Sequence, residues 1–284
     1  MVNIIHMQSL LKSTLLLIFF SVDLHAFEVK RTIFAFWDKP DVVLHYKLPQ
    51  EINDDTKVLF IIHGQSRNAS DYINHWVSIS EGKNVLLIAP EFKKADYKYF
   101  SLLETATSKG AIKQNDDMYL NNSIDSFFTY FQSRYNIQAS KYSIFGHSAG
   151  GQFTHRYLLY SDKPRAEKAV IANPGWYTFL AGARFPYGIT DSPIKIDGDA
   201  VKDFLSMRNT LLLGSDDLGS KSLNMSPGAM KQGENRFVRG NNYFNSLIDI
   251  SSNNSIPFRW NYEAVPDTGH DFRKMSDAAL EILL

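Results

Sequence analysis

The chain has 284 residues, of which 44% are hydrophobic, and this is enough to form one large buried core. Its 30 basic and 30 acidic residues cancel, so the charge gives no reason to expect nucleic acid or an anionic membrane surface as a partner. Cysteine is absent, which excludes disulfides, thiolate metal sites and a cysteine nucleophile.

Residues 1–26 have the pattern of a secretory signal peptide. Lys12 precedes the apolar run 15–20, and Leu24-His25-Ala26 offers a cleavage site before Phe27. The apolar run is short for a segment that spans a bilayer. We therefore predict a secreted or periplasmic protein, with no stable membrane insertion after cleavage. An uncleaved membrane anchor is the alternative.

Strand patterns follow along the rest of the chain. Two early strands, at 28–36 and 42–48, are expected to pair through the turn at 38–40. Continuous apolar runs then recur, and all but the last lack polar alternation, which is typical of parallel strands covered on both faces. These runs are 58–62, 85–89, 142–145, 169–172, 210–213 and 258–265.

Helical patterns lie between these runs, with apolar residues at spacings of three and four. They cover 71–80, 120–135, 150–160 and 275–284. Strands that alternate with helices predict an α/β fold with a mostly parallel, twisted sheet and helices on both faces. We expect residues 27–284 to form a single domain of this kind.

Two stretches, 174–207 and 218–242, fit this alternation poorly. They are rich in Gly, Pro, Asn and aromatic residues, and their periodicity is weak. Both follow strands whose carboxyl ends face the side of the sheet where open α/β folds bind ligands. We therefore expect them to form the walls of a substrate pocket.

The segment 142–151 predicts a nucleophile. An apolar run ends in Gly146-His147-Ser148-Ala149-Gly150, and a helical pattern begins at once. At such a sharp strand-to-helix turn only small neighbours fit, and the helix amino terminus faces any negative charge that develops beside the serine. This context indicates that Ser148 is a catalytic nucleophile.

A serine hydroxyl needs a base, and the base needs an orienting acid. Among the histidines after the leader, only His270 follows both Ser148 and a plausible acid, in the order that this architecture requires. The acid is expected just beyond the strand at 210–213, where Asp216 and Asp217 are the candidates. Asp217 is preferred because the chain has turned back by that point, and Asp216 is the alternative.

Acyl transfer also needs N–H donors for the oxyanion. One is expected from Ala149, at the start of the helix, and the other from Gln65, in the turn after the strand at 58–62. His63 is expected to brace that turn through hydrogen bonds rather than to take part in the chemistry.

With these residues assembled, the chain resembles the α/β-hydrolase family from about residue 56 to its carboxyl end. It is most similar to bacterial secreted esterases grouped with poly(3-hydroxybutyrate) depolymerase-like proteins. That closer likeness is carried by 150–156 (GGQFTHR), 172–177 (ANPGWY) and 185–188 (FPYG). The resemblance implies a serine hydrolase and leaves the substrate open, because one scaffold serves many reactions.

Trp176 and Tyr177 follow a sheet strand and are either pocket residues or a packed loop corner. No histidine pair has the spacing of a catalytic zinc site, so neither a metal nor another cofactor is expected.

The predicted function is hydrolysis of a small-molecule or oligomeric carboxylic ester through Ser148, His270 and Asp217. The alternatives are a peptidase or amidase with the same triad, a factor that acts on the lipids of neighbouring cells, and a non-catalytic binding protein on the same scaffold.

Overall fold

A computed structural model describes residues 28–284. The predicted leader, residues 1–26, lies outside the described residues. Within 28–284, eight strands form one sheet in the order β1-β2-β4-β3-β5-β6-β9-β10. Their bounds are β1 Lys30–Phe34, β2 Val42–Lys47, β3 Lys57–Ile62, β4 Val85–Glu91, β5 Tyr142–His147, β6 Ala166–Ala172, β9 Arg208–Gly214 and β10 Asn261–Val265.

The sheet is mostly parallel, as predicted. The six strands from β4 to β10 in the sheet order run parallel to one another, and β2 is antiparallel to both β1 and β4. Phe34 pairs with Val42, which confirms the early hairpin. The last strand is three residues shorter than predicted. The residues before it bond to the segment before β9, since the Arg259 N–H donates to the carbonyl of Leu205 and the Trp260 indole N–H donates to the carbonyl of Phe204.

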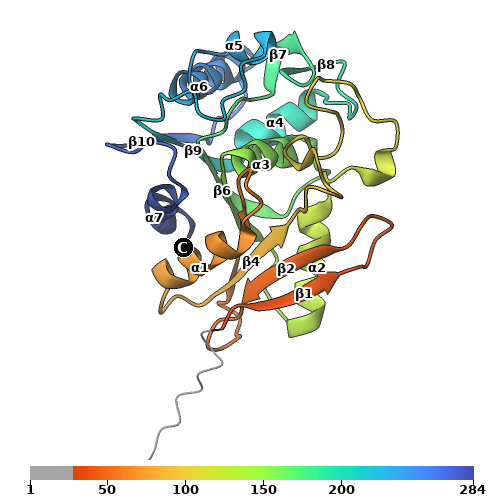
Figure 1. Ribbon diagram of the computed structural model, residues 1–284, viewed down its shortest axis with the longest axis vertical. Helices are drawn as coiled ribbons and strands as arrows, with labels where there is room; N and C mark the ends of the chain where they lie inside the picture. The colour runs from red at the N-terminus through yellow and green to blue at the C-terminus, as the bar shows by residue number, and fades with distance from the viewer. Residues whose placement is uncertain (1–27) are drawn as a thin grey trace, which may run out of the picture.

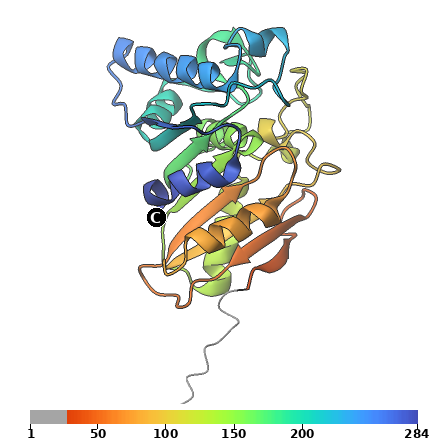
Figure 2. The ribbon, with the colours of Figure 1, turned by 60° about the vertical axis from the view of Figure 1, so that its left-hand side comes forward.

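Helices cover both faces of the sheet (Figure 1). Alternate strand residues point to opposite faces, so that Leu59 and Ile61 pack with α1 (Ala69–Ile79) and α7 (Phe272–Leu283). Figure 2 shows these two helices side by side in front of the strands. Phe60 and Ile62 face the other core, which contains α2 (Ser123–Tyr135) and α3 (Ala149–Tyr160). The predicted α/β layering is therefore confirmed.

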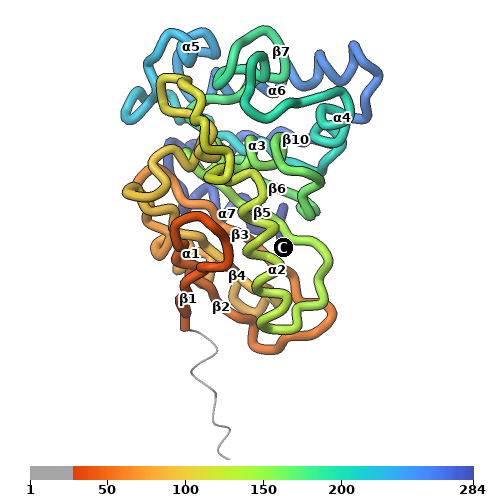
Figure 3. The backbone as a smooth tube through the Cα atoms, turned by 90° about the vertical axis from the view of Figure 1, so that its right-hand side faces the viewer, coloured from red at the N-terminus to blue at the C-terminus, as the bar shows by residue number. Residues whose placement is uncertain are grey.

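The two stretches without a clear pattern contain regular elements that the sequence does not predict. These are β7 (Phe179–Arg184), β8 (Gly188–Thr190), α4 (Gly198–Ser206), α5 (Pro227–Met230) and the first turns of α6 (Arg236–Asn253). They gather at one end of the molecule, away from β1 and β2 (Figure 3). None of the helices described over 28–284 has the length and apolar character needed to cross a membrane.

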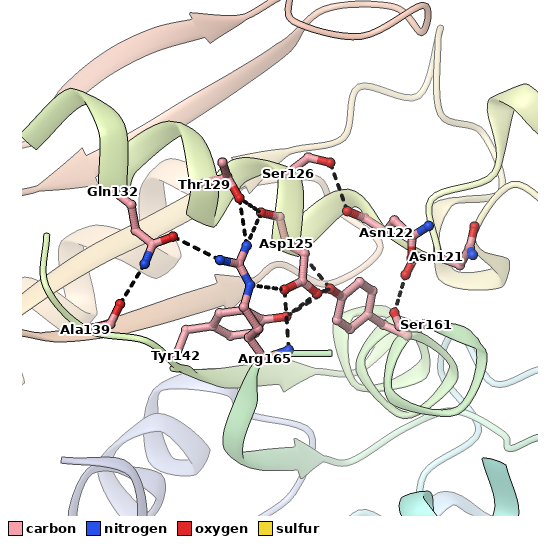
Figure 4. Close-up of polar contacts among 11 residues, drawn as sticks. Asn121, Asn122, Asp125, Ser126, Thr129, Gln132, Ala139, Tyr142, Ser161 and Arg165 are labelled. Atoms are coloured by element: carbon pink, nitrogen blue, oxygen red, sulfur yellow. Dashed lines mark hydrogen bonds and ion pairs between the residues drawn. The ribbon is translucent and has the colours of Figure 1, made fainter. Parts of the chain in front are cut away.

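An ionic network joins α2 to the chain around β5 and β6 (Figure 4). Asp125 accepts hydrogen bonds from the Arg165 Nε–H and the Tyr142 hydroxyl, both at 2.8 Å, and from the Tyr157 hydroxyl. Burial raises the pKa of Tyr142 well above its ordinary value, and the nearby Tyr157 hydroxyl and Asp125 carboxylate raise it further. The Tyr142 hydroxyl therefore keeps its proton and stays a hydrogen-bond donor. Arg165 extends the network to Thr129 and Gln132.

Removing the carboxylate from this network should destabilise the fold. Asp125→Ala would leave two tyrosine hydroxyls and one guanidinium without their shared acceptor, and we expect it to lower the free energy of unfolding by about 3 kcal/mol. Urea unfolding followed by circular dichroism measures the change. The exposed Asp54 supplies the control, since Asp54→Ala should change stability by less than about 0.5 kcal/mol. Equal effects of the two substitutions would contradict this account.

Candidate active site

Ser148 lies in the turn between β5 and α3. Its φ of +59° and ψ of −117° are disfavoured for a residue with a side chain. The turn is held by the Ser148 N–H, which donates to the Ala172 carbonyl at 2.9 Å, and by the Ser148 carbonyl, which accepts from the Gln152 N–H at 3.0 Å. The hydroxyl therefore stands at the amino terminus of α3, as the sequence predicts.

The glycines on either side of Ser148 are sterically required. A Cβ at Gly146 would collide with the Thr154 side chain, and a Cβ at Gly150 would collide with the backbone carbonyl of Ile62. Because Ile62 ends β3, this close approach brings the turn after β3 up to the serine.

His270 and Asp217 complete a chain of hydrogen bonds. His270 Nε2 lies 2.9 Å from Ser148 Oγ, and His270 Nδ1 lies 2.6 Å from Asp217 Oδ2. A turn in which the Asp217 N–H donates to the Gly214 carbonyl at 3.1 Å brings the Asp217 side chain inward, where it is 2% exposed. Asp216 is exposed and accepts from the Ser215 hydroxyl. The structure thus joins Ser148 to His270 and Asp217, and leaves Asp216 outside.

Arg236 is a neighbour of this group that the sequence does not reveal. Its Nη1 lies 3.2 Å from Asp217 Oδ1, and both side chains are almost fully buried. The guanidinium also donates to the carbonyls of Gly219 and Lys221, which holds the loop that carries Asp217. Each Asp217 oxygen therefore has its own partner. Arg236 lies in a stretch without a helical pattern, so no local signal marks it.

The predicted oxyanion donors border the same space as the serine. Gln65 and Ala149 line one cavity with Ser148. The turn after β3 is braced by the buried His63, whose Nε2 accepts from the Phe92 N–H at 3.1 Å while its Nδ1 lies 2.9 Å from the Gly64 carbonyl. This pattern needs the neutral Nδ1–H tautomer, and burial lowers the pKa of His63 to about 4. His63 thus has the bracing contacts that the sequence predicts.

The cavity beside Ser148 has a volume of about 440 Å³, and Trp176 is one of its lining residues. The Arg156 guanidinium lies over the Trp176 ring, 4.2 Å from its centroid. Tyr177, the other expected pocket residue, does not line this cavity. It is fully buried and stacks on Tyr243 with ring centroids 4.4 Å apart. Its backbone N–H and C=O both pair with the Gln232 side chain, which places the phenol in the core.

Three of the buried histidines, His63, His147 and His155, should make the protein sensitive to acid. Besides its effect on His63, burial holds the pKa of His147 and His155 well below the usual value. The unfolded chain binds a proton at each imidazole near pH 6.5, whereas the folded chain does so only at lower pH. The stability that these groups contribute is therefore complete above pH 6.5 and is lost as the pH falls towards 4.

Urea unfolding at several pH values measures this loss. The free energy of unfolding should fall with a slope of up to about 1.4 kcal/mol per pH unit for each buried histidine. His155→Gln should reduce the slope. Ser133→Ala, at an exposed side chain that does not titrate, should leave it unchanged. A free energy that is constant from pH 7 to pH 4.5 would contradict the expectation.

No protein-family model and no curated protein matches the sequence. Solved structures do match it. Poly(aspartic acid) hydrolase-1 from Sphingomonas sp. KT-1 is 30% identical, with a TM-score of 0.83 over 90% of this chain and 98% of that one. LpqC, a poly(3-hydroxybutyrate) depolymerase from Bordetella parapertussis, is 25% identical, with a TM-score of 0.79 over 91% of each chain.

A more distant structure shares the fold. S-formylglutathione hydrolase (FrmB) from Staphylococcus aureus is 16% identical, with a TM-score of 0.57 over 90% of this chain and 98% of that one. These neighbours are hydrolases, and they support hydrolase activity for this chain. With its mostly parallel sheet, its serine turn and this likeness to the Sphingomonas enzyme, the chain belongs to the α/β-hydrolase family, in the group of esterase-like members.

Proposed function

We propose that this protein hydrolyses carboxylic esters through an acyl-enzyme intermediate on Ser148. The observation that carries the proposal is the continuous series of hydrogen bonds from Ser148 Oγ through the His270 ring to Asp217, with 2.9 Å and 2.6 Å between the bonded atoms. Because Asp217 accepts the hydrogen bond from the His270 Nδ1–H, the Nε2 atom of the neutral ring has no proton, and its lone pair faces the serine hydroxyl.

The chemistry follows from these positions. Ser148 Oγ attacks the ester carbonyl carbon while His270 Nε2 takes the hydroxyl proton, and Asp217 stabilises the imidazolium that forms. The N–H groups of Ala149 and Gln65 are the donors for the oxyanion. His270 then gives its proton to the leaving alcohol, and a water activated by the same imidazole releases the acid and restores the serine.

A matched pair of substrates tests the reaction class. We expect p-nitrophenyl butyrate to be hydrolysed with an initial burst of nitrophenol, and the anilide of the same acyl group to react much more slowly. An anilide or peptide that is cleaved faster than the ester would establish an amidase or peptidase instead. A folded protein that cleaves neither and is not labelled by a fluorophosphonate would be a binding protein.

A second candidate is an anionic substrate, as in the poly(aspartic acid) named for the Sphingomonas enzyme. The observation that favours it is the charge of the cavity, whose lining includes Lys94 and Lys98 and neither an aspartate nor a glutamate. The third cation of the lining, Arg236, is already paired with Asp217. Walls of one sign concentrate ligands of the opposite sign, in a manner that salt weakens.

Two esters that differ in the charge of the acyl group distinguish an anionic substrate from a neutral one. p-Nitrophenyl hemisuccinate carries a free carboxylate, and p-nitrophenyl butyrate is its neutral partner. If the substrate is anionic, kcat/KM for the hemisuccinate should fall with added salt and in the double variant Lys94→Ala/Lys98→Ala, while the value for the butyrate stays constant. Equal responses of the two esters would rule out charge selection.

We also propose that the protein acts outside the cytoplasm, since residues 1–26 have the pattern of a secretory leader. Mass spectrometry of the amino terminus of the exported protein tests this, with a start at Phe27 as the expected result and retention of residues 1–26 as the contrary one.

A further inference from the structure

A single buried amide bonds to two of the loops that make up the site. Asn173 directly follows β6 and is 1% exposed. Its Oδ1 accepts from the Gly214 N–H at 2.8 Å, and its Nδ2 donates to the Gly269 carbonyl at 3.3 Å. Gly214 ends β9, three residues before Asp217, and Gly269 directly precedes His270. The amide therefore spans the space between the acid loop and the histidine loop.

The backbone beside Asn173 contacts the third part of the site. The carbonyl of the preceding residue, Ala172, accepts from the Ser148 N–H, and the Asn173 N–H donates to the Leu212 carbonyl at 3.0 Å. Residues 172 and 173 thus bond to the segments that carry all three members of the proposed triad.

The chemistry of the position calls for asparagine. Gly214 N–H can only donate and the Gly269 carbonyl can only accept, so the partners need one acceptor and one donor on the same short side chain. Aspartate lacks the donor, and leucine lacks both. The backbone φ of +42° is in the left-handed region, where asparagine is favoured among residues with a side chain.

We infer that Asn173 is a positioning residue, which sets the distance between Asp217 and His270 and so keeps the imidazole within reach of Ser148. The inference rests on the proposed function. Two further hydrogen bonds join the same loops, from Ser215 N–H to the Val265 carbonyl and from Asp216 N–H to the Thr268 carbonyl. Loss of the amide should therefore loosen the histidine loop without unfolding it.

Asn173→Ala and Asn173→Asp test the inference, because the first removes both bonds and the second removes only the donor to Gly269. We expect kcat for p-nitrophenyl butyrate to fall by about 10–100-fold in Asn173→Ala, with KM close to that of the wild type. Asn173→Asp should show a loss in the same direction. The rate constant of fluorophosphonate labelling at Ser148 should also fall, because labelling depends on the same attack by the serine hydroxyl.

Asn209 provides a matched control, since it is also 1% exposed and lies at the opposite end of β9. Asn209→Ala should retain the wild-type kcat at a temperature where circular dichroism shows each variant folded. A kcat of Asn173→Ala within twofold of the wild type would overturn the inference, and so would an equal loss in Asn209→Ala. A wild-type protein with neither hydrolysis nor labelling would overturn the proposed function, and the inference with it.

Discussion

Ser148→Ala is expected to lower the rate of ester hydrolysis by a factor of about 10⁴–10⁶, to the level left by substrate binding and the oxyanion donors. The substitution removes the oxygen that attacks the ester carbonyl in the proposed mechanism, and His270, which lies 2.9 Å from that oxygen, then has no hydroxyl proton to accept. The hydrolysis of p-nitrophenyl butyrate by purified protein gives the rate, and circular dichroism shows that the fold is kept.

Ser143 supplies the control for this experiment. It is buried in β5, the strand that leads into the serine turn, five residues before Ser148. Ser143→Ala removes an equal number of atoms from the strand but none from the proposed site, so its rate should match that of the wild type. A Ser148→Ala protein that keeps the wild-type rate would show that another residue is the nucleophile.

The second large effect is expected at the acid. Asp217→Asn should lower kcat by about 10⁴-fold, because an amide at this position no longer holds the Nδ1–H tautomer of His270. The same substitution removes the negative charge beside the buried Arg236, which lies 3.2 Å away, so a loss of stability should accompany the loss of rate. Steady-state kinetics and thermal unfolding of one preparation separate the two effects.

Asp216→Asn distinguishes the two aspartates, since they are adjacent in sequence and differ in burial. Within residues 28–284 the exposed Asp216 side chain accepts from the Ser215 hydroxyl and is not hydrogen-bonded to His270, and its substitution should leave kcat within about twofold of the wild type. A large loss in Asp216→Asn together with normal activity in Asp217→Asn would reverse the assignment.

The sequence predicts the sheet well because its strands are continuous apolar runs, such as 58–62, whose residues become the two buried faces. It does not predict α6, whose sequence RFVRGNNYFNSLIDISSN contains many residues with low helix propensity. That helix is held by tertiary contacts, among them the buried Arg239, which donates to the carbonyls of Gly175 and Asn224. A buried arginine that bonds to distant carbonyls leaves no apolar pattern to recognise.

The same reasoning explains which parts of the site the sequence predicts. Ser148 is marked by its flanking glycines, and His270 and Asp217 follow from the order of residues along the chain. Arg236 and Asn173 bond to partners 15 to 96 residues away, so no local pattern reveals these contacts. Trp176 and Tyr177 are adjacent aromatic residues, and the sequence does not tell which of them faces the cavity. The pairing of the Gln232 side chain with the Tyr177 backbone holds Tyr177 in the core and leaves Trp176 at the cavity.

Covalent labelling is the most direct test of the central claim that His270 activates Ser148. The folded protein is treated with a fluorophosphonate, and the site of the adduct is found by peptide mapping with mass spectrometry. The account predicts one adduct, on Ser148, that is absent in Ser148→Ala and forms far more slowly in His270→Ala. A folded wild-type protein that stays unlabelled, or an adduct on a different residue, would contradict it.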